Sequence, residues 1–218
     1  MDNLAELAGL LATPTWETLY MVFFSTLFAT LMGFPLGIVL VVTEKGGILE
    51  NEHLYRVLDG IVNVLRSFPF IILMIILFPL SRVVVGTTIG TTASIVPLAI
   101  AAAPFVARVV ESALKEVDQG LVEAAVSMGS SPKEIIFKVL IPEALPLLVL
   151  GETLTVINII GYSAMAGAIG GGGLGDLAVR YGFHRFQTDV LIAAVVVIIA
   201  MVQVIQGAGN ALARRVSH

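Results

Sequence analysis

The chain contains no cysteine among its 218 residues, and Asp, Glu, Lys and Arg together make up only 13% of it. The absence of cysteine excludes disulfides, thiolate metal sites and a cysteine nucleophile. Soluble globular domains average about 25% charged residues, so the scarcity of charge argues against a water-soluble domain. A net charge of −4 leaves no basic face for nucleic acid. No Lys or Arg precedes Lys45, so the first residues lack the basic region of a cleavable signal peptide, and we expect the first apolar segment to be retained.

Apolar residues account for 57% of the chain, and the mean hydropathy is +0.99. At roughly 20 apolar residues per crossing, this composition predicts an all-α integral membrane protein with five transmembrane helices and no large soluble domain. No internal repeat or linker divides the sequence, so residues 1–218 are expected to form one membrane domain. The expected spans are residues 18–43, 58–80, 87–110, 141–163 and 190–212. A catalytic engine, if the protein needs one, must lie on another chain.

Basic residues predict the orientation of these spans. Nine of the twelve Lys and Arg residues fall on one side of the expected membrane, which the positive-inside rule identifies as the cytoplasm. The N-terminus is then external and the C-terminus cytoplasmic. The nine are Lys45, Arg56, Arg66, Arg108, Lys115, Lys133, Lys138, Arg214 and Arg215, against Arg82, Arg180 and Arg185 outside. The largest cytoplasmic connection is predicted over about 111–140.

Within this connection, local signals predict two short helices. Good helix formers over 121–128 are followed by Gly129, which allows a helix to end in a left-handed conformation. Ser131 and Glu134 then form a capping box with Pro132 at the first helical position. A proline at 142 predicts a kink or break on the return to the membrane. We expect small residues Ala124 and Ala125 to be exposed for close approach by another surface.

The same stretch resembles the EAA loop of ABC importer permeases. Glu123-Ala124-Ala125, then Gly129, then Val139 and Ile141-Pro142 stand at the family's spacings, with two conservative aliphatic replacements. The resemblance implies that this loop docks on a separate cytoplasmic ATPase and transmits its opening and closing. It implies a coupling role for these residues: Glu123, Ala124, Ala125, Met128, Gly129, Ser130, Pro132 and Pro142. The alternative is a solvated loop that merely connects two spans.

Three further segments look like the methionine importer permeases of bacteria. They are LRSFPFIIL from Leu65, VPLAIAAAPFVARVVESAL from Val96 and GYSAMAGAIGGGGLGDLAVRYGF from Gly161. This resemblance implies a type I ABC importer permease fold in the bacterial cytoplasmic (inner) membrane. It also implies a complex of two permease copies, two ATPases that hold ATP and Mg²⁺, and an external methionine-binding lipoprotein. No cofactor is expected on this chain.

Five residues of the fourth span are candidates for the substrate pathway: Glu152, Asn158, Tyr162, Ser163 and Met165. Glu152 is predicted deep in the bilayer, where it can meet the ammonium of an amino acid or contact a neighbouring helix. The other four combine hydrogen-bonding groups with a thioether, which suits a zwitterion with an apolar side chain. They can equally hold helices together.

Other motifs have simpler interpretations. Gly33 and Gly37, four residues apart, predict close helix packing. The run from Gly170 to Gly175 formally matches a dinucleotide fingerprint, but no strand precedes it, so we expect a flexible external loop or gate. No ATP-binding P-loop motif occurs. Histidines at 53, 184 and 218 are isolated, so a metal site is not expected.

The leading hypothesis is therefore a permease subunit of an ATP-driven amino-acid importer, with methionine as the expected substrate, and not an enzyme. An ABC permease for another amino acid or small solute is the first alternative. An ion-coupled secondary carrier is the second, although such carriers rely on internal repeats and several intramembrane ionisable groups. An intramembrane enzyme fails because no catalytic pair of residues lies at membrane depth.

Overall fold

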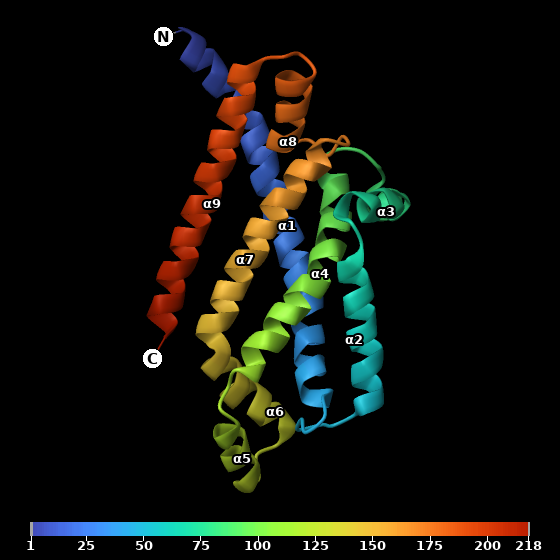
Figure 1. The fold of residues 1–218 in the computed structure, drawn as a ribbon, viewed down its shortest axis with the longest axis vertical. Coiled ribbons are helices and arrows are strands. Elements are labelled where there is room, and N and C mark those ends of the chain that lie inside the picture. Colours follow the sequence, from blue (N-terminus) through green and yellow to red (C-terminus); the bar gives the residue numbers. More distant parts are fainter. Residues whose placement is uncertain (1, 218) are drawn as a thin grey trace.

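The computed structural model describes residues 2–217, with side chains described from residue 7, and every regular element in this range is a helix. Figure 1 shows an elongated bundle with the start of α1 near α8 and the projecting α5 at the opposite end. We call these the α8 end and the α5 end. The elements are α1 (Asp2–Thr43), α2 (Glu52–Ser67), α3 (Phe70–Val85), α4 (Thr91–Lys115), α5 (Gln119–Ser127), α6 (Pro132–Ile135), the π-helix η1 (Ile136–Leu140), α7 (Ile141–Gly167), α8 (Gly173–Leu177), the π-helix η2 (Ala178–Phe183) and α9 (Thr188–Val216).

Four stretches of helix are long and apolar enough to cross a membrane: Leu7–Thr43, Thr91–Lys115, Pro132–Gly167 and Thr188–Val216. A bent pair, α2 and α3, qualifies only when the two helices are taken together. The all-helical membrane class is therefore confirmed. The first helix is longer than the predicted 18–43, because α1 continues towards the N-terminus through Pro14 without a break.

The expected span 58–80 is wrong as a single straight helix. It is divided between α2 and α3, whose axes differ by 106°. Phe68 adopts an extended conformation with ψ 131°, as expected for a residue directly before a proline. Pro69 then lacks an N–H and starts the next helix. The bend follows from this proline and turns α3 across the α8 end (Figure 1).

The predicted loop 111–140 is too long. Helix α4 continues to Lys115, beyond the expected end at 110, and α6, η1 and α7 form one helix from Pro132 to Gly167. A kink or break was expected at Pro142, and the helix does not break there. In η1 the Ile141 N–H donates to the Ile136 carbonyl five residues earlier, so a widened turn lies directly before the proline and accommodates its ring. Only residues 116–131 lie between the two long helices.

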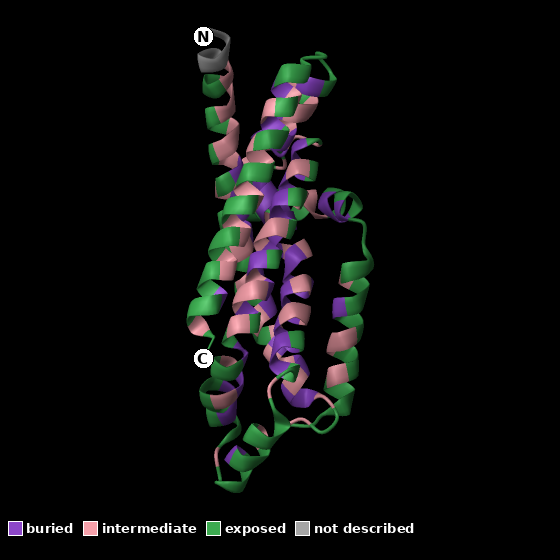
Figure 2. Ribbon diagram, turned by 60° about the vertical axis from the view of Figure 1, so that its left-hand side comes forward, coloured by how far each residue is buried: buried purple, intermediate pink, exposed green. Residues whose placement is uncertain are grey.

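The core is formed where α1, α4 and α7 pack together, and Figure 2 shows its buried residues concentrated in these helices. Gly33 and Gly37 of α1 lie against α4. A Cβ at Gly37 would stand 2.6 Å from the Ala107 carbonyl oxygen and 2.6 Å from the Val110 Cβ. The close packing predicted for these two glycines is confirmed.

We predict that Gly37→Ala destabilises the protein, because its methyl group must push α1 away from the α4 backbone. Overpacking of this kind costs about 1–3 kcal/mol. The measurement is the midpoint of thermal aggregation in detergent, followed by size-exclusion chromatography. Gly60→Ala on α2 is the matched control, since no atom lies within 4 Å of its Cβ position. Equal midpoints for the two variants would contradict the close α1–α4 packing.

Candidate functional site

A compact projection leaves the bundle at the α5 end. It comprises residues 119–135, that is α5, the connecting turn and α6 (Figure 1). Gly129 has φ +79°, and the Ser130 N–H donates to the Ala125 carbonyl at 3.1 Å, so the glycine closes α5. The Ser131 N–H donates to the Glu134 carboxylate at 3.1 Å, and the Glu134 N–H donates to Ser131 Oγ at 3.4 Å. The two helices, the glycine turn and the capping box are as predicted.

Most of the residues assigned to coupling lie on the surface of this projection. Met128 is 79% exposed, and Ser130 is half-buried. The other exposed members are Glu123, Ala124, Gly129 and Pro132. Pro142 is also exposed, but it lies in the first turn of α7 and outside the projection. The structure thus brings six of the eight residues together at the surface of the projection, and three of them, Glu123, Ser130 and Pro132, line a groove on its inner side.

The expectation that Ala125 is exposed is wrong. Its side chain is 4% exposed and belongs to the main core cluster, which also contains Ile135 of α6 and Leu114 of α4. A short helix holds its place only by burying one face, and the small Ala125 lets α5 approach closely. This burial joins the projection to the bundle.

Helix α7 separates the five pathway candidates. Asn158 and Met165 are exposed, and Tyr162 is half-buried, with its ring stacked on Phe70 at 4.6 Å between centroids. Positions 158, 162 and 165 share one helix face, since their spacings are four and three residues. Ser163 is buried and donates to the Ile160 carbonyl at 2.8 Å. It does not join the other three.

Glu152 lies on a different face of α7, towards α1. Its carboxylate accepts a hydrogen bond from Thr30 Oγ1 at 2.5 Å. Both residues line a groove of about 390 Å³ whose other walls are mostly apolar side chains such as Phe23 and Val156. Asn158 follows Glu152 by six positions, so their side chains point roughly 120° apart around the axis of α7. The two residues therefore do not face the same space.

The loop expected over residues 170–175 is shorter than predicted, because only the residues up to Gly172 are non-helical and α8 begins at Gly173. Glu17 and Thr18 of α1 satisfy the free N–H groups at its start. The Gly173 N–H donates to Glu17 Oε2 at 2.8 Å, and the Leu174 N–H donates to Thr18 Oγ1 at 2.9 Å. Leu174 is fully buried. Sequence analysis did not identify Glu17 or Thr18, although a carboxylate and a hydroxyl in adjacent positions of an apolar helix are a usable signal.

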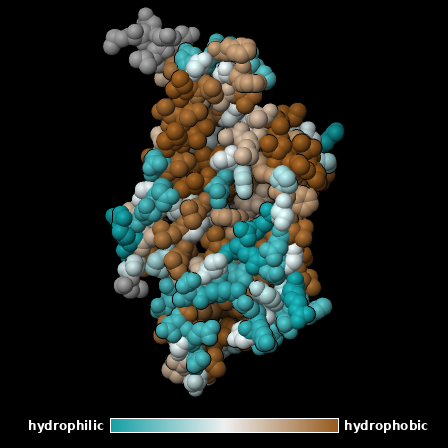
Figure 3. Space-filling model, in the orientation of Figure 1, coloured by the Kyte–Doolittle hydropathy of each residue, from teal (hydrophilic) through white to brown (hydrophobic). Residues whose placement is uncertain are grey.

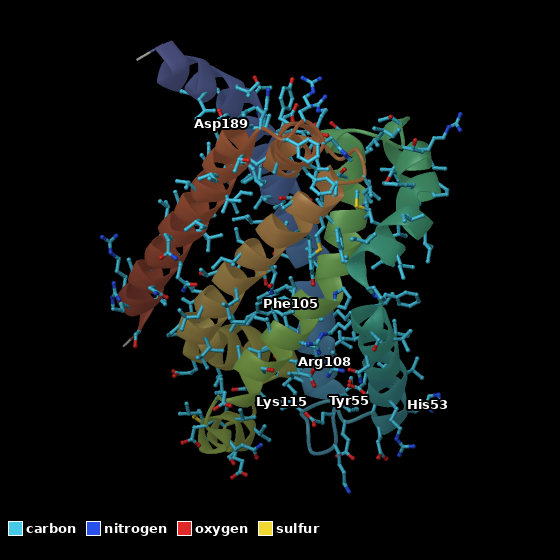
Figure 4. The ribbon with its side chains drawn as sticks, turned by 45° about the horizontal axis from the view of Figure 1, so that its top comes forward. His53, Tyr55, Phe105, Arg108, Lys115 and Asp189 are labelled. Carbon is cyan, nitrogen blue, oxygen red and sulfur yellow. The ribbon has the colours of Figure 1, made fainter. Side chains whose placement is uncertain are left out.

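A cluster of charged residues near the α5 end was also missed. Glu111 is buried, and its carboxylate accepts from Arg108 at 2.6 Å, Lys115 at 2.9 Å and the Tyr55 hydroxyl at 3.4 Å. Arg108 also pairs with Asp59 of α2. Figure 4 shows Arg108, Lys115 and Tyr55 lying together between α2 and α4. Arg108 and Lys115 entered the prediction only as indicators of membrane orientation, so their side-chain partners were missed.

The cluster extends to both neighbours of α4. Lys115 pairs with Glu44, just after the end of α1, at 2.7 Å, and Arg108 donates to the Asn63 side chain of α2 at 2.8 Å. The ends of three helices are thereby fixed relative to one another. Within residues 7–217, no three His, Asp or Glu side chains gather as a metal site would require. His218 lies outside the described residues.

Comparisons with known proteins agree on one family. A family model described as "binding-protein-dependent transport system inner membrane component" matches residues 29–218. The chain is 54% identical to a probable D-methionine transport system permease protein MetI of Vibrio cholerae, over 97% of this chain and 94% of the relative. It is 52% identical to the D-methionine permease MetI of Escherichia coli, over 72% of this chain and 73% of the relative.

Solved structures agree with these sequence matches. An inward-facing structure of the MetNI methionine ABC transporter matches with TM-score 0.96 at 47% identity, covering 98% of this chain and 99% of the other. A structure of an amino acid ABC transporter with histidines matches with TM-score 0.80 at 21% identity over 98% and 97% of the two chains. At that identity the second match concerns the fold alone. With a family model over residues 29–218 and relatives above 50% identity along nearly its whole length, this chain belongs to the binding-protein-dependent transport permeases, the membrane components of ABC importers.

Proposed function

We propose that this chain is the permease subunit of an ATP-driven methionine importer in a bacterial inner membrane. One structural observation carries the proposal. The exposed projection and the apolar bundle share a single continuous helix from Pro132 to Gly167, so a force on the projection acts directly on a helix that crosses the bundle. The match to the inward-facing methionine transporter supports methionine as the substrate. As in the rest of its family, the ATPase is a separate subunit.

We further propose the assembly that such a permease requires. Two copies of the chain pair with two ATPases, which hold ATP and Mg²⁺, and receive substrate from an external binding lipoprotein. The description of the family as binding-protein-dependent supports the last component. The chain forms one membrane domain over residues 1–218, with the type I importer fold.

For the topology we propose five spans, with the bent α2–α3 pair counted as one. The N-terminus is then external, and the C-terminus and the α5 end are cytoplasmic. Figure 3 supports this orientation, because hydrophilic surface gathers around the lower half of the view, near α5 and the start of α2. Six basic residues lie in or next to the elements of that end: Lys45, Arg56, Arg108, Lys115, Lys133 and Lys138.

Coupling follows from how the projection is attached. ATP-driven closure of the ATPase pair displaces the surface formed by Glu123, Ala124, Met128, Gly129 and Pro132. Because Ala125 is packed in the core, α5 moves with the bundle as a rigid body. The displacement passes through η1 and Pro142 into α7, which swings between inward-open and outward-open states.

The face of α7 that carries Asn158, Tyr162 and Met165 is the proposed wall of the pathway. The Asn158 amide can donate a hydrogen bond to a zwitterion and accept one from it. The thioether of Met165 suits an apolar, polarisable substrate side chain. Glu152 and Ser163 would reach this space only after a rotation of α7. They contribute instead to the contact with α1 and to the helix itself in the present conformation.

We predict that Ala124→Arg and Met128→Glu abolish coupling. Both residues are exposed, so the substitutions leave the fold intact while placing a charge against the ATPase. An unpaired charge at an interface costs about 2–5 kcal/mol, so association should weaken by about tenfold or more. Co-purification of the ATPase and ATP-driven uptake in proteoliposomes measure the effect. Ser217→Arg, exposed at the end of α9, is the control for added charge. Unchanged uptake by both variants would contradict the proposal that the projection couples the permease to the ATPase.

We predict that Asn158→Leu lowers methionine uptake without lowering the amount of complex. Loss of a hydrogen bond to a charged group is worth roughly 1.5–3 kcal/mol, or about tenfold or more in uptake efficiency. Initial rates with labelled L- and D-methionine, in competition with the other amino acids, give the effect and the substrate together. Val204→Ala, exposed on α9, should transport normally. Competition won by a polar amino acid would refute methionine as the substrate.

A further inference from the structure

A groove of about 940 Å³ separates the projection from the connection between α1 and α2. One wall is the segment 44–51, which we call the α1–α2 turn, and it contributes Lys45, Gly47 and Ile48. The facing wall is α5, which contributes Val122 and Val126. Both walls lie at the same end of the molecule (Figure 1). Glu123 and Pro132, which the proposed function places against the ATPase, also line this groove, whereas the α1–α2 turn has no role in the proposed function.

The α1–α2 turn is a built structure. The Leu49 N–H donates to the Val42 carbonyl and the Asn51 N–H donates to the Thr43 carbonyl, both at 2.9 Å. The Gly46 N–H donates to the Glu50 carboxylate at 3.0 Å. These bonds fix the backbone of the turn, and Ile48 packs against the main core cluster, so the exposed residues of the turn present a definite shape to a partner.

The turn and the projection are attached to the same helix end. Glu44 pairs with Lys115 at 2.7 Å, and α5 begins at Gln119, four residues after Lys115. The buried Glu111 holds Lys115 from the other side at 2.9 Å. A partner that displaces α5 therefore also moves the α1–α2 turn. In the same way, a partner that contacts the turn also exerts force on the end of α4.

Apolar side chains line both walls of the groove, among them Ile48 of the turn and Val122 and Val126 of α5. Met128 and Leu49, each next in sequence to a residue that lines the groove, are 79% and 50% exposed. Lys45 and Glu123 supply charge on the two walls. An apolar centre with charged edges is the composition of a protein interface. The surface proposed to meet the ATPase shares this groove with the turn, since Glu123, Pro132 and Lys45 all line it.

We infer that the α1–α2 turn is a second docking element for the ATPase, and that a segment of the ATPase with apolar side chains enters the groove between the turn and α5. The inference rests on the proposed function, because it takes the ATPase to be the partner of α5. It adds a contact through which nucleotide-driven motion reaches the ends of α1 and α4 directly, besides its path through α7.

The natural absence of cysteine allows a direct test. Single-cysteine variants Leu49→Cys, Met128→Cys and Val64→Cys are labelled with benzophenone maleimide in the complete transporter, reconstituted in liposomes, and irradiated. Val64 is the matched control, because it is 59% exposed on α2 and lies about three helical turns along α2 from the α1–α2 turn. We expect the probes at 49 and 128 to cross-link the ATPase and the probe at 64 not to do so.

The outcomes separate the inference from the function on which it rests. Cross-linking from 128 but not from 49 overturns the second docking element and leaves the coupling role intact. Cross-linking from 49 to a second permease copy or to lipid alone also overturns it. Failure at both positions overturns the proposed function as well. As a second measurement, Lys45→Glu combined with Leu49→Asp should weaken ATPase association roughly tenfold, whereas Arg56→Glu on α2 should not.

Discussion

The architecture depends on one constraint, that backbone hydrogen-bonding groups inside a bilayer must find partners within the protein. Continuous helices meet this requirement by themselves except at interior prolines such as Pro97 and Pro104 of α4, each of which leaves the carbonyl four residues earlier without its helical donor. Where the backbone is irregular, its hydrogen-bonding groups need partners from other segments. At the start of α8, Glu17 and Thr18 accept hydrogen bonds from the Gly173 and Leu174 N–H groups. Where no such partner exists, as at Pro69, the chain bends and begins a new helix. The fold therefore departs from straight helices at the positions where a proline or a hydrogen-bonding side chain determines the backbone conformation.

The same constraint explains how a small projection can act on a whole bundle. Most loops between membrane helices are free to move independently of the helices that they connect. Here the second half of the connection is absorbed into a helix that runs from Pro132 to Gly167, and Ala125 fastens the first half to the core. The π-helix η1 is important in this arrangement, since its wider turn keeps the helix intact directly before Pro142. A break at that proline would have separated the projection, the surface proposed to meet the ATPase, from the face that carries Asn158.

Local sequence signals predicted the features that depend only on neighbouring residues. The glycine end of α5 and the capping box at Ser131 were predicted correctly, because both arise from residues within four positions of each other. The small-residue contact of α1 was predicted from spacing alone. The burial of Ala125 was not predicted, since it depends on where α6 and α4 lie. The partners of Glu111 were missed for the same reason, because Tyr55 stands 56 positions away in the sequence. The helix breaks were misplaced because a proline gives the position of a disturbance but not how the surrounding backbone absorbs it.

The hydrogen bonds from α8 to Glu17 and Thr18 have a consequence for biosynthesis. They join residues 156 positions apart, so α1 receives these partners only after α7 has been made. Until then a carboxylate and a hydroxyl on α1 must be accommodated near the membrane surface by water or by the insertion machinery. Helix α1 is therefore made early and completes its contacts late. Truncation after α7 would leave Glu17 and Thr18 without these two hydrogen bonds.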